Sequence, residues 1–74
     1  MTQDTPRRAG QVVAFDAHAG LGEIRDQQGM VWPFHCVALS DGSRVVDVGA
    51  DVTFTVRFHV LRDEAFEIDV VAAS

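Results

Sequence analysis

The segment Asp51–Val60, with the sequence DVTFTVRFHV, carries the clearest structural signal in the chain, because apolar and polar residues alternate along it. One face of an extended chain would hold Val52, Phe54, Val56 and Phe58, and the other Thr53, Thr55, Arg57 and His59. Strict alternation of this kind predicts a β-strand with one face buried and the other in water.

Four further β-favouring runs lie outward from this segment and are separated by turn residues. They are Gln11–Phe15, Leu21–Arg25, Met30–Cys36 and Ala65–Val71. None shows the 3.6-residue period of a helix, and the one helical candidate, Val37–Leu39, is too short for more than a turn. Five short strands with turn signals between them predict an all-β domain. A five-stranded antiparallel Greek-key barrel is favoured because it leaves few exposed sheet edges.

The connection between the second and third runs fixes their register. The segment Asp26–Gly29 predicts a tight turn, because its terminal glycine can adopt a positive φ. A turn centred there places Leu21 opposite His35 and Glu23 opposite Pro33 on the outer face of the sheet.

That register also assigns side chains to the core. Trp32 and Phe34 are predicted to point inward, although a slip of one residue would turn Trp32 outward as a stacking platform. Phe15 fits either face. The inner face of the last run is predicted to hold Phe66, Ile68 and Val70. The apolar segment Phe58–Leu61 is interpreted either as a cap on the barrel mouth or as a protein contact.

Length and composition limit the chain to one small globular domain. It has 74 residues, of which 47% are hydrophobic and 23% charged, and these values argue against disorder throughout. Residues 1–9, MTQDTPRRA, are polar and are expected to form a disordered N-terminal arm ahead of a folded domain at 10–74. Arg7 and Arg8 are interpreted as a solvated pair, or as a clamp on nucleic acid.

The charge balance is acidic. Six arginines face eleven acidic residues, which gives a net charge of −5, and there is no lysine. This excludes a generic polycation that binds phosphate backbones. The single cysteine, Cys36, excludes an internal disulfide and favours a reducing compartment. No apolar run approaches the length of a membrane span and Met1–Gly10 has no signal core, so a cytoplasmic protein without membrane contact is predicted.

Reactive side chains are too few to predict catalysis. The sequence has no Ser-His-Asp set, no paired carboxylates in a pocket and no Gly-rich phosphate loop. Neighbours on a strand point to opposite faces, so His35 and Cys36 are not expected to share a metal, and zinc requires three or four ligands. We therefore predict no enzyme, no cofactor and no metal site, with Cys36 as a partly buried thiol that ends the third strand.

The glycines and core positions from Gly10 to Val71 resemble those of the bacterial cold-shock family of oligonucleotide-binding barrels. The matching motifs are Gly10-x-Val12-x-x-Phe15, then Gly20-x-Gly22-x-Ile24 against the family's KGFGFI, and His35-x-x-Ala38-Leu39 against its HFSAI. The string PFHCVALSDGSR at 33–44 is similar to an actinobacterial-type subgroup of short cold-shock-like proteins. The resemblance implies an OB-fold and a nucleic-acid-binding module.

The aromatic residues that stack on bases in that family are mostly replaced in this sequence. Family members stack unpaired bases on aromatic rings of the second and third strands, with lysines along the phosphates. The corresponding positions hold Ala14, Leu21, Glu23, Pro33 and Cys36, and His35 alone is retained. Each base–aromatic stack is worth about 1–3 kcal/mol, so the loss of several predicts weak binding, and the charge of Glu23 adds repulsion.

Two functions therefore remain open at this point. The first is weak binding of single-stranded RNA or DNA, and its candidate contacts are His35, Leu21, Phe15, Pro33, Arg25 and Arg44. The second is a protein-interaction or regulatory module that has lost nucleic-acid binding, with a protein partner or as a homodimer. The acidic charge and the outward apolar side chains of Leu21 and Pro33 favour this alternative.

Overall fold

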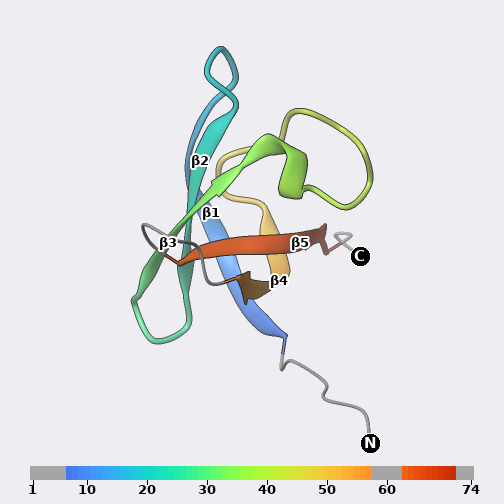
Figure 1. The fold of residues 1–74 in the computed structure, drawn as a ribbon. Coiled ribbons are helices and arrows are strands. Elements are labelled where there is room, and N and C mark those ends of the chain that lie inside the picture. Colours follow the sequence, from blue (N-terminus) through green and yellow to red (C-terminus); the bar gives the residue numbers. More distant parts are fainter. Residues whose placement is uncertain (1–6, 58–62, 72–74) are drawn as a thin grey trace, which may run out of the picture.

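The computed structural model describes residues 7–57 and 63–71, and within them it contains five strands and one short helix (Figure 1). The elements are β1 (Arg8–Asp16), β2 (Leu21–Asp26), β3 (Val31–His35), the 3-10 helix η1 (Cys36–Ala38), β4 (Asp51–Arg57) and β5 (Glu64–Val70). The strands form one antiparallel sheet in the order β3-β2-β1-β4-β5. This confirms the predicted all-β, five-stranded architecture.

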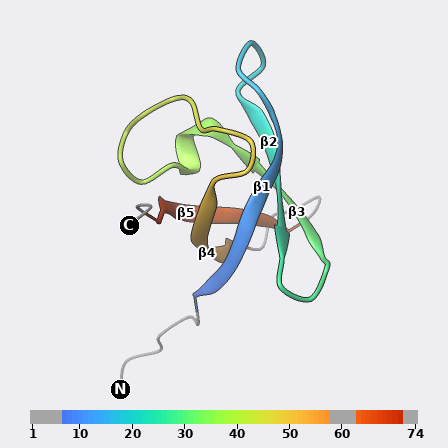
Figure 2. The same cartoon turned by 180° about the vertical axis from the view of Figure 1, so that it is seen from behind.

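The sheet curls into a barrel around β1. This strand pairs with β4 through its first half and with β2 from Gly10 onward, and β5 crosses it at a steep angle in both views (Figures 1 and 2). The two ends of the sheet meet where Leu39, just after η1, forms a parallel bridge with Ile68. The next residue strengthens this closure, since the Ser40 backbone N–H donates to the Ile68 carbonyl oxygen at 2.9 Å.

The core lies inside this curved sheet. Its buried apolar residues are Val12, Ile24, Phe34, Ala38, Leu39, Val52, Phe54, Ala65 and Ile68. Phe34 is 2% exposed and Trp32 is half-buried against the core, which confirms the inward orientation predicted for both.

The predicted register of β2 and β3 is also confirmed. Leu21 pairs with His35 and Glu23 with Pro33, and Gly29 in the connecting turn has a φ of 86°. Burial alternates along β2, so that Leu21 and Glu23 face outward while their neighbours are buried. The outer face of this hairpin is therefore the one that the sequence indicated.

The predicted inner face of the last strand is wrong at Phe66. Glu67 has a φ of 50°, and at this point two residues of β5 lie opposite one residue of β4. One extra residue breaks the two-residue alternation, so that residues three apart on either side of it can both face the core. Ala65 is therefore buried and Phe66 only half-buried, while Ile68 is buried as expected. Val70, at the end of the strand, is 47% exposed.

The first strand starts earlier than the predicted run. β1 begins at Arg8, three residues before Gln11. The Arg7 guanidinium donates to the carbonyl oxygens of Thr53 and Glu67, at 3.0 and 2.6 Å, and pairs with the Asp69 carboxylate at 3.0 Å. Arg7 is thus anchored across β4 and β5, although it remains exposed. Residues 1–6 of the predicted arm lie outside the described residues.

Asp26 organises the turn between β2 and β3. One carboxylate oxygen accepts hydrogen bonds from the backbone N–H groups of Gln28 and Met30, at 2.8 and 2.9 Å. The other accepts one from Trp32 Nε1 at 2.8 Å. The Arg8 guanidinium lies 3.8 Å from the same oxygen and 5.1 Å from the centre of the Trp32 ring. Asp26 therefore joins the start of β1 to the hairpin, a role that its place in a turn motif did not indicate.

These contacts give the fold a specific pH dependence. The hydrogen bond from Trp32, with those from Met30 and Gln28 and the charge of Arg8, holds the pKa of Asp26 below its usual value of 3.8. A lowered folded-state pKa stabilises the protein above the unfolded pKa, and this contribution is lost as the pH falls through the folded value.

We therefore expect Asp26→Asn to be clearly less stable than the wild type at pH 7, with the difference shrinking below pH 4. Urea unfolding followed by circular dichroism at pH 7 and pH 2 measures this. Asp47→Asn, at an exposed position, is the control. A wild-type advantage that is the same at both pH values would contradict the role given to the ionised carboxylate.

Some of the predictions from the sequence concern residues between β4 and β5 that the structure does not describe. The apolar segment Phe58–Leu61, interpreted as a cap or a contact, lies outside the described residues, as does Arg62. In the part of the chain that is described, no helix is long and apolar enough to cross a membrane.

Candidate nucleic-acid interface

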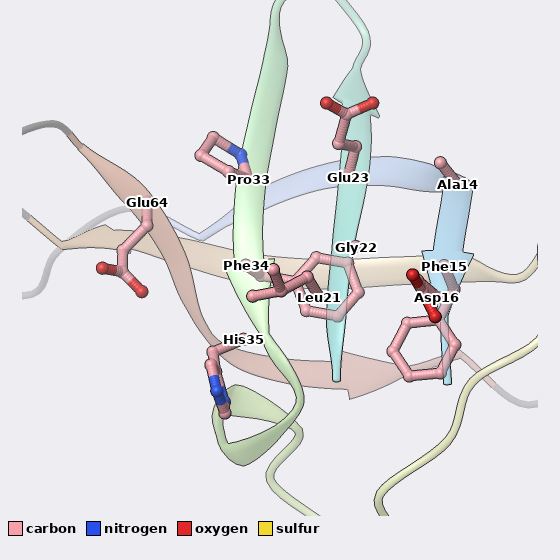
Figure 3. Close-up of a pocket in the computed structure, with 10 residues that line it drawn as sticks. All are labelled: Ala14, Phe15, Asp16, Leu21, Gly22, Glu23, Pro33, Phe34, His35 and Glu64. Atoms are coloured by element: carbon pink, nitrogen blue, oxygen red, sulfur yellow. The ribbon is translucent and has the colours of Figure 1, made fainter. Parts of the chain in front are cut away.

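An open pocket of about 530 Å³ lies over β1, β2 and β3 and reaches the start of β5 (Figure 3). We call it the β1–β3 pocket. It is lined by Ala14, Phe15, Asp16, Leu21, Gly22, Glu23, Pro33, Phe34, His35 and Glu64. Four of the six predicted contact residues, Phe15, Leu21, Pro33 and His35, are thus brought together on one surface.

The floor of the pocket is built on Gly22. This residue pairs with Phe15 on one side and Phe34 on the other, and the two rings are stacked 6.0 Å apart at an angle of 11°. A Cβ atom at Gly22 would lie 2.5 Å from the Phe34 ring and 2.9 Å from the Ala14 carbonyl oxygen. Glycine here leaves the space that the Phe34 ring occupies, so the floor is apolar and closely packed.

Leu21 and Pro33 form the apolar part of the rim. Leu21 is 49% exposed although it is a large aliphatic residue. Pro33 is half-buried and lies on β3, an outer strand in the order of the sheet, where a residue without a backbone N–H is tolerated. Both side chains offer apolar surface that a base can contact with its face.

Cys36 does not lie on the third strand, where the sequence predicted it, whereas His35 does. β3 ends at His35 and η1 begins at Cys36. His35 Nδ1 accepts a long hydrogen bond of 3.4 Å from the Val37 backbone N–H and lies 3.8 Å from the Cys36 sulfur. Cys36 is a buried free thiol in the helix rather than at the end of the strand. With Nδ1 as acceptor, the proton of the neutral ring is on Nε2.

The charges that line the pocket are mostly negative. Asp16, Glu23 and Glu64 contribute carboxylates, and the described lining residues include no arginine. One oxygen of Asp16 is engaged in its own turn, where it accepts from the backbone N–H groups of His18 and Ala19 at 3.0 and 3.2 Å. Within residues 7–57 and 63–71, no group of three or more histidine, cysteine or acidic side chains is arranged to hold a metal ion.

The two predicted arginine contacts lie outside the pocket. Arg25 is exposed on the outer face of β2, two residues beyond Glu23, and borders a second surface depression near Gln11 and Asp51. Arg44 is exposed in the segment that joins η1 to β4. Arg25 and Arg44 can therefore contact the phosphates of a bound single strand of nucleic acid only where that nucleic acid extends beyond the pocket.

Glu64 is a pocket residue that the sequence analysis missed. It is the first residue of β5 and is far from β3 along the chain, but β5 lies beside β3 in the closed barrel (Figure 3). The predicted Greek-key closure was the available signal, since it places the last strand next to the third.

Comparison with known proteins identifies the fold. No family model and no curated protein sequence matches this chain. A solved structure described as Drosophila Unr CSD456, a cold-shock domain structure, superposes with a TM-score of 0.77 and 26% sequence identity over 93% of this chain. The fold is a cold-shock-like OB-fold. The match covers 28% of that larger chain, so the likeness concerns the domain and not the whole of that protein.

Proposed function

We propose that this cold-shock-like chain is a small non-enzymatic module that binds single-stranded RNA or DNA weakly through the β1–β3 pocket. The observation that carries the proposal is the convergence of Phe15, Leu21, Pro33 and His35 on one open surface of an OB-fold. OB-folds use such surfaces to stack unpaired bases. Arg25 and Arg44 would contact phosphates at the margins.

The expected affinity is low because few rings are available. Phe15 is half-buried under the pocket, and His35 is the only other aromatic ring among the proposed contacts. With about 1–3 kcal/mol for each stack, and carboxylates on the rim, the dissociation constant is expected to be about 100 μM or weaker.

A titration of ¹⁵N-labelled protein with hexathymidine and with a mixed-sequence RNA hexamer tests this proposal. We expect saturable chemical-shift changes at the amides of residues 21–23 and 34–36. Leu21→Ala should weaken binding several-fold because it removes apolar surface from the rim, whereas Val48→Ala, at an exposed position outside the pocket, should not.

The same titration at two salt concentrations measures the contribution of phosphates. Single-strand binding weakens with salt with a slope of about −0.7 per neutralised phosphate, and two arginines limit that number to about two. Affinity should therefore fall no more than about sevenfold from 50 to 200 mM salt. No shifts at about 1 mM oligonucleotide, or shifts only outside the pocket, would contradict the proposal.

A second candidate is a protein-interaction or regulatory module, with either a different protein or a second copy of the chain as its partner. Three carboxylates around exposed apolar surface favour it, because they repel phosphates and suit a partner with basic groups. Light scattering after size exclusion, and capture of partners from nuclease-treated lysate, distinguish the two. A dimer or a nuclease-resistant partner, together with an absence of oligonucleotide shifts, would favour this alternative.

The proposal also includes the group of proteins to which the chain is assigned and the cellular compartment. The segment 33–44 supports its placement with the actinobacterial-type group of bacterial cold-shock-like proteins. The free thiol of Cys36 supports a reducing cytoplasm.

A further inference from the structure

Glu23 is the one pocket carboxylate without a described partner. It is exposed on β2, and among residues 7–57 and 63–71 it takes part in no hydrogen bond or ion pair. Asp16 is engaged in its turn, and Glu64 has an interaction of its own. The residues paired with Glu23 are Ala14, with a methyl side chain, and Pro33, without a backbone N–H.

Glu23 lies on the same face of β2 as Leu21 and borders the same pocket. Residues two apart on a strand share a face and are about 6.6–6.8 Å apart, and Leu21 and Glu23 have this relation on β2. Glu23 is also paired with Pro33, which lines the same pocket (Figure 3). A base that rests on Leu21 and Pro33 can therefore turn one edge toward the Glu23 carboxylate.

The chemistry of a carboxylate separates the bases by their edges. An ionised carboxylate only accepts hydrogen bonds. Guanine offers N1–H and N2–H side by side, which fit the two carboxylate oxygens, and cytosine and adenine each offer one amino group. Thymine and uracil offer a single N–H between two carbonyl oxygens, which a carboxylate repels.

We propose that Glu23 makes the β1–β3 pocket select bases that present an amino group, guanine most strongly, over thymine and uracil. This inference rests on the proposed single-strand binding and adds a ligand class to it. Discrimination by a bidentate pair in water is expected at the lower end of the usual range, about fivefold.

Fluorescence anisotropy with four labelled hexadeoxynucleotides tests the inference. One is all thymine, and the others carry guanine, cytosine or inosine at the third position. The wild-type protein should bind the guanine hexamer about fivefold more tightly than hexathymidine. Inosine lacks the N2 amino group and should lose part of this gain. Glu23→Gln should reduce the preference to within about twofold, whereas Asp47→Asn removes the same charge outside the pocket and should retain it.

The outcomes distinguish the base preference assigned to Glu23 from the proposed binding of single strands. Equal binding of the four hexamers by the wild type, or a preference for hexathymidine, would overturn the inference and leave single-strand binding intact. A guanine preference that persists in Glu23→Gln would also overturn it. Absence of binding by every hexamer would overturn the proposed function together with the inference. The inosine comparison uses the unaltered protein, so it does not depend on the folding of a variant.

Discussion

Replacing Phe34 by alanine is expected to lower the free energy of unfolding by about 3–5 kcal/mol, the range for a buried phenylalanine. The ring is 2% exposed, stacks on Phe15 and fills the space above Gly22. A domain of this size has a small total free energy of unfolding, so this loss should remove a large share of it. The floor of the β1–β3 pocket would be lost with the core.

Urea unfolding followed by circular dichroism measures the effect. Phe66→Ala is a matched control, because Phe66 is half-buried and covered on one side by the Arg57 guanidinium, 4.4 Å from the ring centre. The control should lose less than half as much stability. A loss below about 1 kcal/mol for Phe34→Ala would show that the ring is not part of a closely packed core.

The sequence was sufficient to predict features that depend on local pattern. The turn at Asp26–Gly29 fixed the register of β2 and β3, and with it the outward positions of Leu21 and Glu23. The inward orientation of Phe34 followed from the same register. These inferences succeeded because a strand has a two-residue period and a tight turn leaves one pairing that buries the apolar side chains.

Features that depend on contacts between distant segments were not predictable in the same way. The bulge at Glu67 puts Phe66 and Ile68 on different faces, although no glycine marks the position. The anchoring of Arg7 requires the carbonyl oxygens of β4 and β5 to converge on it. The carboxylate of Glu64 reaches the pocket only because the barrel closes. Each of these depends on the tertiary arrangement, which a single sequence does not specify locally.

The double substitution Leu21→Phe with Glu23→Phe is expected to raise affinity for hexathymidine by about 30-fold or more. Both residues are exposed on one face of β2 and border an open pocket, so two rings can be accommodated without disturbing the core. Two new base–aromatic stacks contribute at least about 2 kcal/mol, which corresponds to that factor. Removal of the Glu23 carboxylate also relieves its repulsion of phosphates.

Anisotropy titration with labelled hexathymidine measures this gain, and Asp47→Phe with Val48→Phe is the matched control. The control also adds two rings and removes one carboxylate, but at exposed positions outside the pocket. It should change the affinity less than threefold, because isolated rings without a neighbouring surface do not align successive bases. The β2 variant should in addition lose the guanine preference that we assign to Glu23. An equal gain in both variants would mean that added aromatic surface anywhere on the protein suffices. In that case the β1–β3 pocket would have no special part in binding single strands.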